Sequence, residues 1–204
     1  MTIAENIARI RANMAAAARE AGRDPKEILL VGASKMNDAA ACREAVAAGI
    51  DALGENRVQE MVQKLEQHAY DGAPLHFIGH LQRNKVKQVV GHVALIQSVG
   101  SLELLDEIEK VAAARGLVQD ILLEVNIGRE AAKSGFAPEK VLPAAEAALE
   151  RTHVRVRGLM TIPPADAQRD ANFRYFQEVQ ALYVDMNQKL FHNELEYLSM
   201  GMSG

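Results

Sequence analysis

The stretch Ile28-Leu29-Leu30-Val31-Gly32-Ala33-Ser34-Lys35 is an apolar run that ends in a serine and a lysine. Its aliphatic side chains predict a buried β-strand that meets a loop at Lys35. An ammonium group in an apolar wall is costly unless it is paired or neutral, and a neutral lysine amine is a nucleophile toward aldehydes. A carbonyl ligand is therefore the first ligand to consider. A lysine that extends past the strand end into water would give the same pattern.

Strand and helix patterns alternate along the rest of the chain. About the first 20 residues predict an amphipathic helix, with a capping-box pattern at Thr2 and Glu5. The predicted strands span residues 28–33, 52–53, 75–78, 93–96, 121–125, 154–160 and 195–198. Helical faces run from Val58 to Leu65, Val86 to Val90, Leu102 to Ala112 and Phe173 to Met186. This alternation predicts parallel strands joined by right-handed crossovers.

Two α/β architectures fit this order, a doubly wound open sheet and a closed barrel. The barrel is favoured because a dinucleotide-type glycine pattern does not follow the first strand and polar residues follow many strands. We therefore expect a single-domain (β/α)8 TIM barrel over residues 1–204, with an extra N-terminal helix. Since seven strands fit the pattern, we also expect that the eighth strand and last helix are missing from this sequence. The polar residues that would meet at one rim are Ser34, Lys35, Glu55, Asn56, His80, Gln97, Ser98, Asn126, Thr161, Ser199 and Ser203.

Composition describes an ordinary globular protein. The 204 residues are 49% hydrophobic and carry a formal charge of -4, which gives no electrostatic reason to expect nucleic acid or membrane partners. The single cysteine cannot close an intrachain disulfide, and the N-terminus lacks a signal-peptide pattern, so we expect a cytoplasmic protein. The six histidines form no metal-binding pattern. A monomer is the simplest expectation, although one chain does not determine the oligomeric state.

Six motifs occur in order along the chain: Val31 to Lys35, Gly54 to Glu60, His76 to Lys85, Lys133 to Gly135, Gly158 to Met160 and Ser199 to Ser203. Together they resemble the pyridoxal 5'-phosphate (PLP) homeostasis protein family, which is similar to the N-terminal barrel of alanine racemase. The likeness covers nearly the whole chain. It implies that Lys35 carries PLP as a Schiff base and that the protein acts in intracellular PLP homeostasis and cofactor delivery without efficient catalysis. PLP-dependent apoenzymes would be transient partners.

The predicted cofactor site combines this resemblance with the chemistry of each residue. For the phosphate we favour hydroxyls and a glycine that allows close backbone approach, although a helix N-cap turn would use the same residues. Asn56 fits both a helix cap and an amide at the cofactor ring, and it is preferred to Glu55. Arg57 departs from the tyrosine found in many relatives. The predicted cofactor-binding residues are Lys35, Asn56, Met160, Ser199, Gly201, Met202 and Ser203.

Four further residues could lie around this site, each with a plainer alternative. Ser34 precedes the lysine, and Asn126 could line the ring face as a rim residue without chemistry of its own. His80 could carry a proton, although a solvated loop histidine is the better interpretation. Lys133 could be a second amine or an anion clamp, although a solvated loop lysine is again favoured.

Racemisation on PLP needs two proton carriers on opposite ring faces, and a second one is not evident. Tyr70, Tyr175 and Tyr183 fall within or beside predicted helices, and Tyr197 falls inside a strand. This favours a carrier over an enzyme. The alternatives are a PLP-dependent amino-acid racemase and a Schiff-base aldolase that uses Lys35.

Overall fold

The computed structural model describes residues 1–131, 133–164 and 169–201. The chain divides into two compact units, Met1–His76 and Phe77–Gly204. Strand β3 (Leu75–Phe77) falls at the boundary between them. Seven strands alternate with helices along the described residues, which confirms the predicted order of elements.

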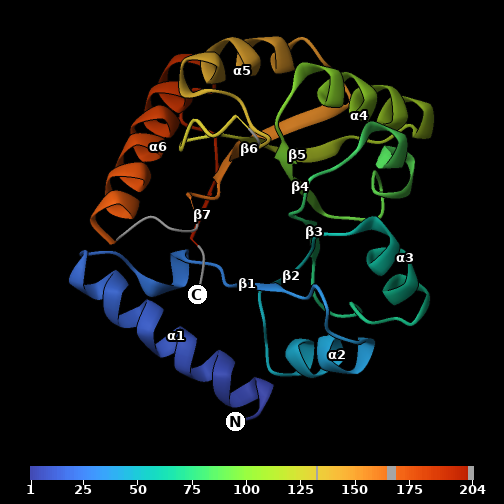
Figure 1. The fold of residues 1–204 in the computed structure, drawn as a ribbon, viewed down its shortest axis with the longest axis vertical. Helices are drawn as coiled ribbons and strands as arrows, with labels where there is room; N and C mark the ends of the chain where they lie inside the picture. Colours follow the sequence, from blue (N-terminus) through green and yellow to red (C-terminus); the bar gives the residue numbers. More distant parts are fainter. Residues whose placement is uncertain (132, 165–168, 202–204) are drawn as a thin grey trace. The chain divides into compact units, whose positions relative to one another are not determined.

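The first unit begins with α1 (Ile3–Glu20), whose predicted capping box is confirmed. Thr2 Oγ1 accepts a hydrogen bond from the Glu5 backbone, and the Glu5 side chain accepts one from the Thr2 backbone. Strands β1 (Val31–Ala33) and β2 (Ala52–Glu55) are parallel neighbours (Figure 1). The remaining elements are a 3-10 helix at Pro25–Glu27, α2 (Ala39–Ala47) and α3 (Val58–Glu66).

The first predicted strand was too long at its N-terminal end. Ile28 ends the 3-10 turn, and Leu29 is 51% exposed. The backbone N–H of Leu30 donates to the Asp51 carboxylate at 2.7 Å instead of to a neighbouring strand. The strand therefore starts only at Val31, and its residues are half-buried or exposed.

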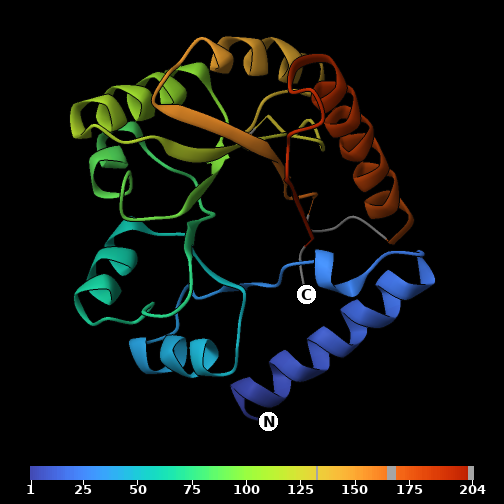
Figure 2. The same cartoon turned by 180° about the vertical axis from the view of Figure 1, so that it is seen from behind.

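The second unit contains four parallel strands in sequence order: β4 (Leu95–Val99), β5 (Gln119–Glu124), β6 (Val154–Thr161) and β7 (Tyr197–Met200). Helices α4 (Leu102–Arg115), α5 (Val141–Leu149) and α6 (Arg169–Leu190) lie along their outer side (Figure 2). The described residues of this unit also include two 3-10 helices, Arg83–Gln88 and Pro138–Lys140. The face from Val86 to Val90, expected to be helical, belongs largely to the first of these and is 3-10 instead of α.

Gly158 adapts β6 to both of its neighbours. The register between β5 and β6 shifts beside this residue, and its φ of +151° is unfavourable for other amino acids. A Cβ atom at this position would lie 1.7 Å from the Tyr197 carbonyl oxygen. The close approach of β6 to β7 therefore requires glycine.

Candidate functional site

The structure brings Lys35 and Asn56 to the same edge of the first unit. Ala33 of β1 is in register with Gly54 of β2, and the Ser34 N–H donates to the Gly54 carbonyl at 2.9 Å. Lys35 and Asn56 each follow that pair by two residues, so they leave adjoining parallel strands together. Lys35 is exposed, which agrees with the alternative that it extends past the strand end into water instead of lying in an apolar wall.

Asn56 has a buried acceptor available for a ligand. The expectation that Asn56 caps the following helix is wrong, because the N-cap of α3 is Arg57. Asn56 Oδ1 is buried and has no hydrogen-bond partner within the described residues. A buried carbonyl oxygen without a donor is unfavourable, so this site suits a group that brings an O–H or N–H. The Arg57 side chain is mostly exposed and pairs with Glu60 at 3.3 Å.

A buried polar network lies beneath these strand ends. Glu55 is fully buried, and its Oε1 accepts hydrogen bonds from Lys64 Nζ at 2.6 Å, Ser34 Oγ at 2.7 Å and Tyr70 Oη at 2.9 Å. Burial, reinforced by the Glu55 charge, raises the pKa of the Tyr70 hydroxyl, which therefore stays protonated. Three donors on one oxygen hold this carboxylate in a fixed position.

Sequence reasoning missed Lys64, although a signal for it existed. The buried residues of α3 are Val58, Met61 and Lys64, which recur at helical spacing on one face. A lysine in line with an apolar stripe is a candidate for a buried ion pair. Its partner Glu55 follows a strand in the sequence, and only the packing of α3 against β2 shows that they meet.

The predicted phosphate residues belong to the second unit. Ser199 in β7 donates its hydroxyl to Gln97 Oε1 of β4 at 2.7 Å. Gly201 has a φ of +119°, which favours glycine, and a Cβ added there would meet no described atom within 4 Å. Met160 is buried in an apolar cluster with Leu95 and Leu122. The predicted residues Met202 and Ser203 lie outside the described residues.

The four residues predicted around the cofactor site either have hydrogen-bond or ion-pair partners within the protein or are exposed. Asn126 follows β5, donates to the Glu130 carbonyl at 2.9 Å and accepts from the Glu130 N–H at 3.1 Å, so its amide organises its own loop. Lys133 Nζ pairs with the Glu130 carboxylate at 2.6 Å. His80 follows β3 and is exposed. Ser34 belongs to the Glu55 network.

Glu124, at the end of β5, was not singled out from the sequence. Burial raises the pKa of its carboxyl group, and Ser134 Oγ donates to it at 3.1 Å. Its second oxygen is buried without a hydrogen-bond partner in the described part of the chain.

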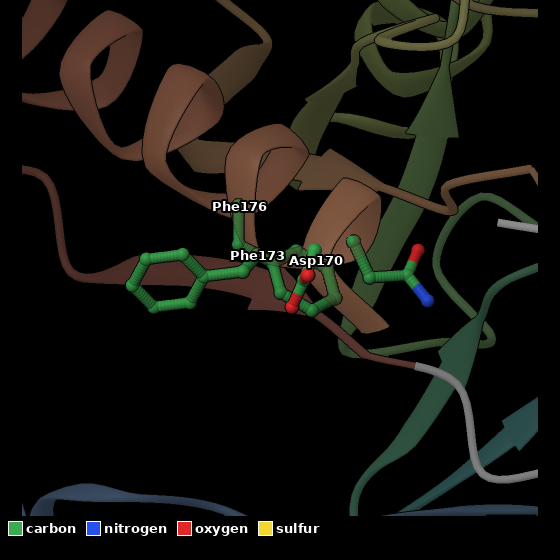
Figure 3. A pocket seen from close by; sticks show the side chains of 4 residues that line it. Asp170, Phe173 and Phe176 are labelled. Atoms are coloured by element: carbon green, nitrogen blue, oxygen red, sulfur yellow. The ribbon is translucent and has the colours of Figure 1, made fainter. Parts of the chain in front are cut away.

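A surface hollow at the start of α6 is lined by Asp170, Asn172, Phe173 and Phe176 (Figure 3). It contains none of the predicted cofactor residues. Among the helices of the described residues, none has the length and apolar character to cross a membrane.

The family model of the alanine racemase N-terminal domain matches residues 6–204 of this chain. A pyridoxal phosphate homeostasis protein from Aquifex aeolicus is 40% identical over 203 residues, which cover 100% of this chain and 89% of that protein. One from Pseudomonas aeruginosa is 40% identical over 202 residues, covering 99% of this chain and 86% of that protein. The chain therefore belongs to the alanine racemase N-terminal domain family, and the predicted resemblance is confirmed.

Solved structures agree on the fold. PipY of Synechococcus elongatus without PLP superposes with a TM-score of 0.87 at 31% identity, over 99% of this chain and 90% of that chain. The PLP-bound form of PipY gives a TM-score of 0.84 at 30% identity, with the same coverage. An alanine racemase from Clostridium difficile, 16% identical with a TM-score of 0.69, covers 94% of this chain and 48% of that chain and shares the fold. The predicted fold class, an alanine racemase-like α/β barrel, is confirmed.

Proposed function

We propose that this protein binds PLP as a Schiff base on Lys35 and acts in intracellular PLP homeostasis and cofactor delivery, without efficient catalysis. The observation that carries the proposal is the position of Lys35 beside Asn56 at one strand edge of a chain in this family. It is supported by 40% identity with PLP homeostasis proteins and by the likeness to PLP-bound PipY. We further propose a single-domain, monomeric, cytoplasmic protein that contacts apoenzymes transiently.

The chain supplies groups for each part of the cofactor. Lys35 would hold PLP through its side-chain amine, and PLP would supply the aldehyde with which that amine condenses, with loss of water. The buried Asn56 Oδ1 would accept a hydrogen bond from the ring hydroxyl. Ser199, Gly201, Met202 and Ser203 are proposed at the phosphate, where a hydroxyl and backbone N–H groups can donate to an anion. Met160 is proposed near the ring, and Ser34, His80, Asn126 and Lys133 as surrounding residues.

The tyrosines support a carrier instead of a racemase. Tyr70 Oη donates to the Glu55 carboxylate, and Tyr183 Oη donates to the Leu195 carbonyl at 2.7 Å. The Tyr197 ring lies under the Arg157 guanidinium, 5.5 Å from it. The Tyr70 and Tyr183 hydroxyls, already used within the fold, are therefore poor candidates for a second proton carrier at the ring.

Borohydride trapping tests the proposal. The purified protein is mixed with PLP, its spectrum is recorded, and the complex is reduced and mapped by peptide mass spectrometry. We expect a near-visible absorbance band and a pyridoxyl adduct on Lys35, both lost in Lys35→Ala. Lys26→Ala is the matched control, because Lys26 is an exposed lysine of the same unit and should leave the band unchanged.

Other outcomes identify the alternatives. An adduct on Lys133 in place of Lys35 would refute the assignment of the amine. A sugar-derived adduct on Lys35 would favour a Schiff-base aldolase. Conversion of L-alanine to D-alanine at a rate that depends on Lys35 would establish a racemase.

A further inference from the structure

Helix α3 contacts both peptide groups that flank Lys35. Lys64 Nζ donates to the carbonyl oxygen of Ser34 at 2.8 Å, on the N-terminal side of Lys35. On the C-terminal side, the backbone N–H of Met36 donates to Glu60 Oε2 at 3.0 Å. Glu60 and Lys64 lie one helical turn apart, with 4.0 Å between their charged groups. One helix therefore holds the backbone before and after the proposed cofactor lysine.

The turn at Lys35 depends on hydrogen bonds and not on packing. Met36 adopts a left-handed φ of +63°, a conformation that is unfavourable for a non-glycine residue. Its side chain is 87% exposed, so apolar contacts do little to offset that cost. The Glu60 carboxylate receives the Met36 N–H, and the Asn37 amide donates to the Lys35 carbonyl at 3.2 Å. These bonds select the backbone conformation at Lys35.

We call the hydrogen bonds of Glu60 and Lys64 to the backbone around Lys35 the α3 clamp, and this clamp is itself anchored in the core. Lys64 Nζ also donates to Glu55 Oε1, which is fixed by Ser34 and Tyr70. The hydrogen bond from the Met36 backbone is the main cause that lowers the pKa of Glu60, so this carboxylate is charged at neutral pH. A charged acceptor makes a stronger hydrogen bond than a neutral one. Both contacts of α3 with the lysine turn are therefore charge-assisted.

We propose that Glu60 and Lys64 are positioning residues that fix the backbone of Lys35 so that its amine is presented to PLP. The inference rests on the proposed function of Lys35. A lysine side chain has four rotatable bonds, so a loose backbone would spread its Nζ over many positions. Fixing the backbone removes part of the entropic cost of covalent capture.

Glu60→Ala and Glu60→Gln test the clamp, because the glutamine keeps an oxygen that can accept from the Met36 N–H. Hydrogen exchange of the Met36 amide is measured without cofactor. We expect protection in the wild type and in Glu60→Gln, and faster exchange in Glu60→Ala. PLP titration should show affinity lowered about tenfold or more in Glu60→Ala, the loss expected for one hydrogen bond to a charged group. Glu60→Gln should restore part of it, because its neutral oxygen still accepts from the Met36 N–H but makes a weaker hydrogen bond. Glu66→Ala, an exposed glutamate of the same helix, should match the wild type in both measurements.

The two measurements separate this inference from the function on which it rests. Unchanged Met36 exchange in Glu60→Ala would overturn the clamp whether or not PLP binds. Faster exchange with unchanged PLP affinity would show a structural brace without a positioning role. If the wild type fails to form an adduct on Lys35, the proposed function itself is refuted. Melting temperatures of all variants show whether a lower affinity reflects unfolding.

Discussion

Lys64→Met tests whether the buried ion pair with Glu55 is required for the fold. The two charged groups are 2.6 Å apart, and the side chains of Lys64 and Glu55 are 8% and 0% exposed. Methionine retains much of the apolar stem of lysine but removes the ammonium. The substitution would leave the Glu55 carboxylate buried with only the hydroxyl donors of Ser34 and Tyr70.

The expected loss of stability is large for a single substitution. Removing one partner of a buried ion pair typically costs about 3–5 kcal/mol, because the remaining charge is desolvated and uncompensated. A chain of this length loses roughly 2–4 °C of melting temperature per kcal/mol. We therefore expect a decrease of roughly 6–20 °C, against a total stability of about 5–15 kcal/mol.

Urea unfolding followed by circular dichroism measures this loss, with two further variants as references. Lys110→Met removes an exposed pair with Glu107, whose charged groups are 3.4 Å apart and whose lysine is 74% exposed. That control should cost less than about 1 kcal/mol. The double variant Glu55→Gln/Lys64→Met also removes the uncompensated charge of the Glu55 carboxylate and should recover much of the stability lost in Lys64→Met.

Two results would refute the reasoning. If Lys64→Met costs no more than Lys110→Met, the buried Glu55 carboxylate does not depend on the Lys64 ammonium. If the double variant is no more stable than Lys64→Met, the loss comes from packing or from the hydrogen bond to Ser34, and not from an uncompensated charge.

Three further predictions concern other parts of the fold. Gly158→Ala should prevent stable pairing of β6 with β7, since its Cβ would lie 1.7 Å from the Tyr197 carbonyl; a cooperative melt at the wild-type temperature would contradict this. Burial lowers the pKa of His76 from 6.5 to about 4, so the unfolded chain takes up a proton that the native protein does not, and stability falls as pH falls through that window. Between pH 7.5 and 4.5, the free energy of unfolding measured in urea should fall by about 2 kcal/mol less in His76→Phe than in the wild type. Equal decreases in the two proteins would refute the lowered pKa of His76. The Cys42 thiol, 2% exposed and with its pKa raised by burial, should react with a disulfide reagent far more slowly in the native protein than in urea, and equal rates would show that the site opens readily.

The sequence predicted the elements whose large apolar residues repeat at a clear spacing. Helix α1 and the strands fall where expected, apart from shifts at their ends. Helices α2 and α5 lie within the predicted alternation, but no helical face was assigned to them because alanines form most of their buried faces. Small side chains bury little area, so an amphipathic stripe made of them is weak in the sequence.

The parts of the proposed site that lie at neighbouring strand ends could be predicted from the sequence, whereas the contacts between distant elements could not. Lys35 and Asn56 could be placed together because parallel strands end at one edge. Gln97 and Ser199, 102 positions apart, were both expected at the rim because each follows a strand or ends one, but their direct hydrogen bond was not predicted. The clamp from α3 also depends on how a helix packs against a strand edge, which periodicity does not encode.

The lysine with a buried charge is Lys64 and not Lys35. Lys35 is exposed, whereas Lys64 is the buried ammonium with a matched carboxylate partner. Because a buried ion pair can often be replaced by apolar residues without loss of stability, stability alone is a weak reason for this one. The hydrogen bond from Lys64 to the Ser34 carbonyl connects the ion pair directly to the turn that carries Lys35. An apolar replacement could fill the same volume, but it would leave the Ser34 carbonyl with the Asn37 N–H at 3.1 Å and without its contact to α3. The positioning role therefore accounts for a charge that packing alone does not require.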